Sequence, residues 1–290
     1  MPELKLEGVT KRFKQKEAVK NVSMNLTEGV YGFLGENGAG KTTLLRMLCG
    51  VLRPTEGMIT CDNVDIRTLD GEYRHMLGYL PQDFGYYPDF TAKRYLNYLA
   101  ACKALPRETA ASKTLEYMEL VGLEEHQNQK IKTFSGGMLR RLGIAQALLN
   151  EPEILILDEP TSGLDPRERI RFRNIISSLS KDRIVILSTH IVSDVEYIAD
   201  EIMLMKSGRI LCQGRMDSIT KAAEGKVWEC TVSQQESDRL NDEFAICNLR
   251  NVESSVHLRI VAEKCPVKGA RPVEPGLEDA YLYYMGGERE

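Results

Sequence analysis

This 290-residue chain contains one glycine-rich segment whose residue types suit phosphate chemistry, Gly35-Glu36-Asn37-Gly38-Ala39-Gly40-Lys41-Thr42-Thr43. The backbone N–H groups of such a turn converge on phosphate oxygens only where side chains stay clear, as they do at glycines. Lys41 is placed to reach the β- and γ-phosphates of a nucleotide, and the Thr42 hydroxyl is placed to ligate Mg²⁺. We predict that residues 35–43 bind a nucleoside triphosphate with Mg²⁺; the alternative is a plain glycine turn before a helix.

Two adjacent carboxylates, Asp158 and Glu159, follow the aliphatic run Ile154–Leu157. Such a run is typical of a buried strand, and open α/β sheets bind ligands at the carboxyl ends of their strands. We expect Asp158 to hold Mg²⁺ and Glu159 to act as general base on the attacking water. The alternative is a pair of solvated acids in a turn before Pro160.

The elements predicted around these residues belong to an α/β core. The run Gly29–Leu34 is typical of a buried strand that leads into the glycine loop. Strand, glycine loop and helix in this order are the context that a phosphate-binding loop requires. The helix is predicted from residues that share one face: Leu44, Leu45, Leu48 and Val51. Further strands are predicted at Leu4–Val9 and, as central parallel strands, at Ile154–Leu157 and Ile184–Leu187.

Two regions outside this core have a different pattern. Between Tyr86 and Leu149, apolar residues recur at helical spacing with few strand signals, which predicts a helical subdomain. After Gln213-Gly214, the polar segment Thr220–Gly225 is typical of a linker. The run Val227–Val232 and the alternation over residues 256–260 then predict a small β-containing appendage.

Composition and charge narrow the class of protein. The net charge of −4 provides no field that would recruit nucleic acid or an anionic membrane. Seven cysteines occur without any Cys-x-x-Cys spacing, so we expect free thiols in a reducing compartment. The N-terminus lacks the apolar core of a signal peptide, and no run of about 20 apolar residues could span a bilayer. We therefore expect any membrane role to involve another chain.

A second glycine signal, Phe134-Ser135-Gly136-Gly137-Met138, carries a family resemblance. A hydroxyl and bare amides at a helix start form an anion-binding arrangement, which alone is a weak signal. Together with the phosphate loop, Asp158-Glu159-Pro160 and three further motifs, it makes residues 3–222 resemble the ATP-binding cassette family, the motor subunits of transporters. The further motifs are Gln82, Ser162-Gly163-Leu164-Asp165 and His190 after a strand.

The resemblance implies an α/β fold built on a P-loop NTPase (RecA-like) core. An inserted helical subdomain and a small C-terminal β-containing appendage complete it. The nucleotide-binding domain would occupy residues 1–222, with its core at 1–85 and 151–222 and its helical subdomain at 86–150. The accessory domain would occupy residues 223–290.

The resemblance also implies an ATP sandwich, in which two cassettes meet head to tail. Each nucleotide would lie between the phosphate loop of one copy, Gly35 to Thr43, and the Ser135, Gly136 and Gly137 of the other. Lys41 and Glu159 would be catalytic groups. The remaining assignments are Gln82 on Mg²⁺ and the attacking water, His190 on the γ-phosphate and beside Glu159, Asp165 at the dimer interface, and Phe13 stacked on adenine.

The signature segment departs from the family's usual pattern at two positions. Met138 stands where glutamine is usual, and Phe134 stands where leucine is common. This version looks like the cassettes of bacterial exporters whose permease is a separate polypeptide. The tail Pro272–Gly286 is similar to the C-terminal ends of those subunits; an amphipathic packing helix is the alternative.

The function that the resemblance implies is an ATP-hydrolysing subunit that dimerises around two ATP and drives a separate transmembrane permease. We expect the transporter to be an exporter and this subunit to work at the cytoplasmic face of the membrane. Its twin would be a second copy or a closely related cassette. The aromatic segment Phe84–Phe90 suits a groove for a permease helix, or joins the two subdomains. A non-transport cassette that acts on ribosomes or DNA is the alternative, although no nucleic acid partner is expected. Ser135 lies 94 residues after Lys41, too few for the long insertion of chromosome-maintenance ATPases.

Overall fold

The computed structural model describes residues 1–286, which divide into two compact units. Unit 1 holds residues 1–200 and 205–210, and unit 2 holds residues 201–204 and those from 211 onward. The sequence-based boundary at residue 222 remains a prediction, and the last four residues of the predicted appendage, 287–290, lie outside the described residues. Within residues 1–286, no helix has the length and apolar character needed to cross a bilayer.

A parallel sheet forms the centre of unit 1, with neighbouring strands in the order β3-β8-β7-β6. Every residue of β7 and β8 is buried, as expected for aliphatic strands covered on both faces. The predicted strands at 29–34, 154–157 and 184–187 are thereby confirmed. The bounds are β3 (Gly29–Leu34), β6 (Leu77–Leu80), β7 (Ile154–Asp158) and β8 (Ile184–Thr189).

An antiparallel sheet of unit 1 has the order β2-β1-β4-β5. Buried and exposed residues alternate along β2, which is the pattern of a sheet with one covered face. The predicted first strand is confirmed and extends further than expected, to Phe13. The bounds are β1 (Leu4–Phe13), β2 (Lys16–Leu26), β4 (Glu56–Cys61) and β5 (Val64–Asp65).

The helix after the phosphate loop is α1 (Lys41–Leu48), and it buries the three leucines of the predicted face. The prediction for Val51 is wrong, because α1 ends before this residue and its side chain is 70% exposed. Gly50 has a φ of +69°, a left-handed conformation that commonly ends helices. The other helices of this core are α2 (Ile66–Leu69), α3 (Gly71–Met76), α7 (Pro166–Leu179) and α8 (Val192–Glu196).

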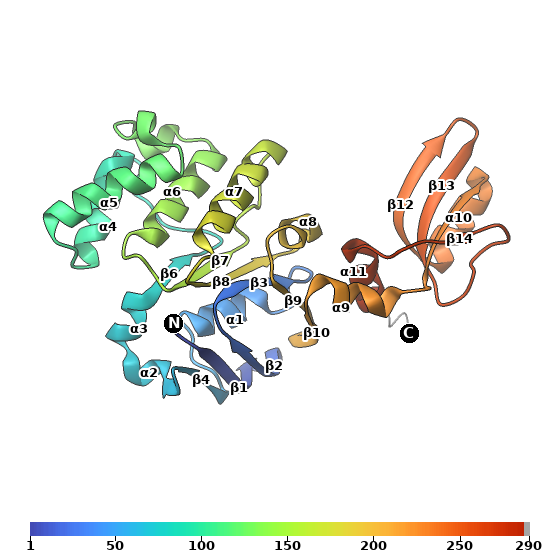
Figure 1. The fold of residues 1–290 in the computed structure, drawn as a ribbon, viewed down its shortest axis with the longest axis horizontal. Coiled ribbons are helices and arrows are strands. Elements are labelled where there is room, and N and C mark those ends of the chain that lie inside the picture. Colours follow the sequence, from blue (N-terminus) through green and yellow to red (C-terminus); the bar gives the residue numbers. More distant parts are fainter. Residues whose placement is uncertain (287–290) are drawn as a thin grey trace. The chain divides into compact units, whose positions relative to one another are not determined.

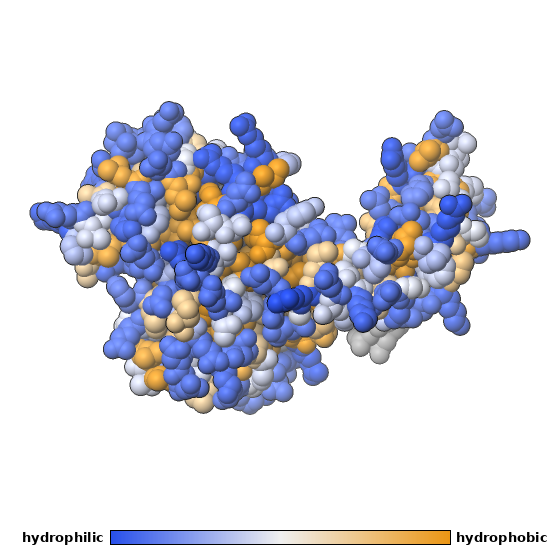
Figure 2. Space-filling view, in the orientation of Figure 1, coloured by the Kyte–Doolittle hydropathy of each residue, from blue (hydrophilic) through white to orange (hydrophobic). Residues whose placement is uncertain are grey.

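The segment between β6 and β7 is helical, as predicted. Three helices, α4, α5 and α6, pack against one another in unit 1 and are drawn in green (Figure 1). On the face of this unit drawn in Figure 2, hydrophilic residues predominate and hydrophobic residues appear between them in patches. The bounds are α4 (Ala92–Cys102), α5 (Arg107–Leu120), α6 (Gly136–Leu148) and the 3₁₀ helices η1 (Glu124–His126) and η2 (Ile131–Thr133).

The chain passes from unit 1 to unit 2 through β9 (Glu201–Lys206) and β10 (Arg209–Gly214). Unit 2 contains an antiparallel sheet in the order β12-β13-β11-β14, and its predicted strands at 227–232 and 256–260 are confirmed. The predicted linker instead forms a 3₁₀ helix, because Ala223 is fully buried and anchors it. The bounds are α9 (Met216–Thr220), η3 (Lys221–Ala223), β11 (Val227–Val232), α10 (Gln234–Glu243), β12 (Ala245–Val252), β13 (Ser255–Val261), β14 (Arg271–Pro272) and α11 (Leu277–Gly286).

A buried ion pair fixes α11 to the sheet of unit 2. The Arg259 guanidinium donates to both carboxylate oxygens of Asp279, and its Nη2 lies 2.7 Å from Asp279 Oδ2. The same guanidinium donates to Glu229 at 2.8 Å, and the Gly276 N–H donates to Asp279 at 2.7 Å. The side chain of Asp279 is only 3% exposed, so this carboxylate depends on these donors.

Candidate nucleotide and catalytic site

The carboxyl ends of three parallel strands bring the predicted site residues to one edge of the central sheet. Leu34 pairs with Thr189, and Asp158 pairs with Ser188, so β3, β7 and β8 end side by side. The phosphate loop follows β3, the acidic pair ends β7, and His190 follows β8. This edge is where open α/β sheets bind their ligands.

The phosphate loop needs its glycines because backbone passes close to it. A Cβ on Gly35 would lie 2.2 Å from the carbonyl oxygen of Met205, and one on Gly40 would lie 2.3 Å from that of Ala18. Gly40 also has a φ of +111°, which side chains rarely adopt. The loop leads directly into the N-terminus of α1, whose free N–H groups and positive dipole end favour an anion.

Lys41 is the first residue of α1, and its ammonium is directed back into the phosphate loop. Its Nζ donates to the carbonyl oxygens of Gly35 at 2.5 Å and Glu36 at 3.1 Å, and lies 3.4 Å from Glu159 Oε1. Burial lowers the pKa of the Lys41 ammonium, and the attraction of Glu159 opposes that shift. A bound phosphate would add negative charge where this buried cation lies.

Asp158 is fully buried at the end of β7 and has one oxygen engaged. Its Oδ1 accepts hydrogen bonds from Thr42 Oγ1 at 3.1 Å and Ser188 Oγ at 2.6 Å. Its Oδ2 is buried without a hydrogen-bond partner among residues 1–286. A hydroxyl and a carboxylate oxygen are hard ligands of the kind Mg²⁺ takes, so the residues fit this ion. No group of three His, Cys, Asp or Glu side chains in the described chain could hold a metal, so Thr42 and Asp158 would share the ion with phosphate oxygens and water.

Glu159 and His190 are in contact. His190 Nδ1 lies 2.8 Å from Glu159 Oε2, and the Glu159 side chain is 6% exposed. Glu159 has a φ of +48°, an uncommon conformation for a residue with a side chain. Its N–H donates to both the carbonyl and the hydroxyl of Ser188, each at 3.1 Å, which holds the turn in place. The pair can therefore orient and deprotonate a water molecule beside the phosphate loop.

Lys41, Thr42 and Glu159 line a cavity of about 500 Å³, whereas Asp158 and His190 are not among its lining residues. Phe13 lies on its wall with a half-exposed ring, and Gln82 also lines it. The ring of Phe13 has Lys11 Nζ at 5.3 Å from its centroid. The cavity-lining residues are Phe13, Lys16, Ala18, Glu36, Asn37, Gly38, Gly40, Lys41, Thr42, Thr43, Gln82 and Glu159.

The signature residues do not line this cavity. Ser135 caps α6, where its Oγ accepts a hydrogen bond from the N–H of Met138 at 3.2 Å. Ser135 and Gly136 are exposed, and a Cβ on Gly136 would meet no atom within 4 Å. Asp165 is also exposed and caps α7 by accepting from the N–H of Glu168 at 2.9 Å. Within one chain, the N-terminus of α6 at Ser135 and Gly136 is therefore exposed.

Sequence reasoning missed the residues that support the catalytic pair. Ser188 holds both Asp158 and the backbone of Glu159, and its only signal was a hydroxyl at the end of an apolar strand. Lys16 and Ala18 also line the cavity, although no motif marked them.

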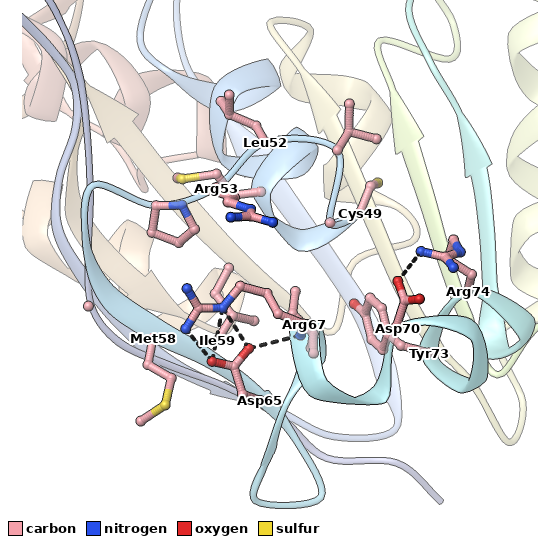
Figure 3. A pocket seen from close by; sticks show the side chains of 16 residues that line it. Cys49, Leu52, Arg53, Met58, Ile59, Asp65, Arg67, Asp70, Tyr73 and Arg74 are labelled. Carbon is pink, nitrogen blue, oxygen red and sulfur yellow. Dashed lines mark hydrogen bonds and ion pairs between the residues drawn. The ribbon is translucent and has the colours of Figure 1, made fainter.

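A second cavity of about 220 Å³ lies between the end of α1, β4 and the segment around α2 and α3 (Figure 3). Two of its arginines are already paired, Arg67 with Asp65 and Arg74 with Asp70. The cavity contains none of the predicted nucleotide-binding residues. The phosphate-loop cavity is therefore the candidate site.

Comparisons with known proteins agree with this site. A sequence model of the ABC transporter family matches residues 19–162, which include the phosphate loop, the signature segment and the acidic pair. The chain is 39% identical over 233 residues to the uncharacterised ABC transporter ATP-binding protein YxlF of Bacillus subtilis, with 80% of this chain and 77% of that protein covered. It is 35% identical over 216 residues to the Nod factor export ATP-binding protein I of Ralstonia nicotianae, with 74% and 67% covered.

Solved structures agree as well. The bacterial ABC transporter cassette MJ0796 matches with a TM-score of 0.67 and 29% sequence identity, over 73% of this chain and 98% of that one. MJ0796 is dimeric in that structure and in a second one, a post-hydrolysis state bound to ADP and Pi with the same match values. The likeness confirms the predicted P-loop NTPase fold.

Proposed function

This chain belongs to the ABC transporter family of ATP-binding cassettes, and we propose that it powers an exporter whose transmembrane permease is a separate polypeptide. As a member of this family it binds ATP and hydrolyses it. The observation that supports the ATP-hydrolysing part of the proposal is the meeting of Lys41, Asp158, Glu159 and His190 at one edge of the sheet.

The phosphate loop and its lysine hold the nucleotide. The backbone N–H groups of residues 35–43 and the N-terminus of α1 bind the phosphates. When the nucleotide binds, the Lys41 ammonium leaves the carbonyl oxygens of Gly35 and Glu36 and donates to the β- and γ-phosphate oxygens instead. Thr42 and Asp158, with Gln82, would hold Mg²⁺. Mg²⁺ supplies positive charge that stabilises the charge developing on the phosphate oxygens. Phe13 offers an exposed ring for the adenine.

Glu159 is the general base in this proposal. Its carboxylate accepts the proton of the attacking water, and His190 keeps the carboxylate directed toward that water through the 2.8 Å contact. Ser188 and the buried end of β7 fix the turn, so little rearrangement is needed at the moment of reaction.

Two cassettes complete each site. The exposed helix end at Ser135 and Gly136 favours an anion, and the γ-phosphate held by the loop of a second cassette would supply it. MJ0796, the structural relative, is dimeric. The second cassette is another copy of this chain or a closely related one. ATP binding would join the two cassettes, and hydrolysis would release them.

A groove in unit 1 is the proposed docking site of the permease. It has a volume of about 570 Å³ and is lined by residues of α3, β6, α4 and α6, together with the exposed Val51. Beside it lies an aromatic cluster in which Tyr87 stacks on Phe90 with a centroid distance of 4.7 Å, and Tyr87 and Tyr98 are exposed. Such a groove suits a short amphipathic helix. The cassette would then work at the cytoplasmic face of the membrane, held there by its permease.

Export is the proposed direction because a relative that is 35% identical over 74% of this chain is a Nod factor export ATP-binding protein. No observation favours the alternative of ribosome or DNA binding, and the net charge of −4 argues against it.

The Glu159→Gln variant tests the proposal. The variant should bind ATP with unchanged affinity, lose about 10²- to 10⁴-fold in turnover, and accumulate a closed dimer, because only the base is removed. Phosphate release and light scattering after gel filtration with Mg-ATP measure these results. Wild-type turnover would refute the role of Glu159, and a strictly monomeric variant would refute the shared site.

A further inference from the structure

A buried carboxylate that this mechanism leaves unused lies behind the catalytic pair. Asp194, in α8, is 1% exposed. Its Oδ2 accepts hydrogen bonds from two hydroxyls, Thr161 Oγ1 and Thr189 Oγ1, the second at 3.3 Å. Both threonines are themselves buried, at 1% and 0% exposure. Carboxylates are seldom fully buried in proteins unless they are paired or hydrogen-bonded, because burial removes their hydration.

The two threonines belong to the turns that carry the catalytic groups. Thr161 lies two residues after Glu159, in a turn where the Ser162 N–H donates to the Glu159 carbonyl at 3.2 Å. Thr189 directly precedes His190, and its hydroxyl accepts from the N–H of Ile191 at 3.0 Å. The hydroxyl therefore fixes the chain on both sides of His190.

These contacts form a closed circuit of residues. The backbone connects Glu159 to Thr161, and the Thr161 hydroxyl donates to the Asp194 carboxylate. The same carboxylate accepts from the hydroxyl of Thr189, the residue before His190. The circuit closes because the His190 imidazole lies 2.8 Å from Glu159. The left-handed backbone of Glu159 persists only where its surroundings hold it. One side of this circuit is the contact between His190 and Glu159. The other side is the Asp194 tie, the pair of hydrogen bonds from Thr161 and Thr189 to Asp194.

We infer that Asp194 is a positioning residue that locks the Glu159 turn and the His190 turn into one rigid unit. Without the tie, the His190 ring and the Glu159 carboxylate lose their common orientation toward the water, while the phosphate loop keeps its structure. The inference rests on the proposed roles of Glu159 and His190.

The need for a carboxylate at position 194 can be tested by substitution, because only one of the two Asp194 oxygens accepts hydrogen bonds. Its Oδ1 is buried without a hydrogen-bond partner among the described residues. Asparagine has the same shape, but it would place an N–H₂ donor where no acceptor is available and would remove the charge that draws in both hydroxyls. Asp194→Asn should therefore loosen the tie without creating a cavity.

The experiment measures steady-state ATP hydrolysis of the full chain, with circular dichroism to confirm folding. Asp194→Asn, Thr161→Val and Thr189→Val should each lower kcat by about tenfold to a hundredfold, the range expected for a misplaced catalytic group, and should leave KM for ATP within about twofold. The matched control is Thr114→Val, another fully buried threonine, whose hydroxyl lies 3.5 Å from Asn97 Oδ1 in the helical subdomain. Its kcat should not change. A folded Asp194→Asn variant with wild-type kcat would overturn the inference.

A double-variant cycle distinguishes positioning from general destabilisation. If Asp194 aligns His190 with Glu159, Asp194→Asn should lower the single-turnover rate by a clearly smaller factor in the His190→Ala background than in the wild-type background. Equal losses in both backgrounds would overturn the inference. If Asp194→Asn does not fold, Thr161→Val and Thr189→Val, which keep the carboxylate, are used in the same cycle. Failure of the proposed function is a different result, because Glu159→Gln or His190→Ala alone would then retain wild-type turnover.

Discussion

Replacing Asp279 by asparagine should selectively destabilise unit 2. The side chain is 3% exposed and accepts from Arg259 and the Gly276 N–H, so the substitution keeps the volume but removes the charge. Losing hydrogen bonds to a charged group costs about 1.5 to 3 kcal/mol. We expect a loss of about 2 kcal/mol in the free energy of unfolding, because Arg259 is 24% exposed and Glu229, 2.8 Å away, still neutralises it.

The effect should depend on pH in a defined direction. Burial alone would raise the pKa of the Asp279 carboxyl, but hydrogen bonds from Arg259, from the Cys247 thiol and from the Gly276 N–H lower it. The unfolded chain therefore binds the proton more tightly than the folded chain, and the stabilisation is fully present above the unfolded pKa of about 3.9. It is lost as the pH falls through the lower folded value. The difference between wild type and variant should be complete at pH 7 and should shrink in acid.

The chain provides its own probe for this measurement. Its one tryptophan, Trp228, lies in β11, where its indole N–H donates to the carbonyl of Ala262 at 3.0 Å. Tryptophan fluorescence during urea unfolding of the full chain therefore reports on unit 2. The control is Glu236→Gln, which breaks the exposed ion pair with Arg239 and should change the free energy of unfolding by less than about 1 kcal/mol. A change below about 1 kcal/mol for Asp279→Asn at pH 7, or a difference that persists undiminished in acid, would refute the reasoning.

Two further predictions concern nucleotide and permease. Lys41→Ala should weaken ATP binding and abolish turnover, because the cation beside the phosphates is lost. Titration with a fluorescent ATP analogue measures the affinity, and phosphate release measures the turnover. Retained affinity would contradict the role of Lys41. Replacing Tyr86 and Tyr87 together with serine should leave ATP binding intact but weaken permease association, because both rings are exposed; the assay is recovery of a multi-span protein with the tagged chain from detergent-solubilised membranes. Unchanged recovery would remove the aromatic cluster from the proposed docking surface.

Much of the core could be predicted because its signals are local. The strand before the phosphate loop and the aliphatic strands β7 and β8 consist of residues that are buried wherever they occur, and their order places the site at one edge. The need for glycine at position 40 can be inferred from the sequence, since few other residues adopt the positive φ found there. Such positions are dictated by covalent geometry and burial.

The errors occurred at a helix end and where tertiary contacts decide. Val51 fitted the helical period, yet Gly50 ends the helix first. The polar segment at 220–225 resembled a linker, but one small buried residue, Ala223, turns it into a packed helix. The tie through Asp194 was not predicted, because its threonine partners lie 33 and 5 residues away and an isolated aspartate after a strand carries no pattern.

The position of Ser135 outside the cavity that holds Lys41 has a genetic consequence. If each site draws the two residues from different subunits, an allele defective at Lys41 and an allele defective at Ser135 are each inactive alone. Mixed dimers of the two gene products contain one site with both residues intact and one site with both altered. Co-expression of two such null alleles should therefore restore part of the activity, whereas two alleles altered at the same residue should not.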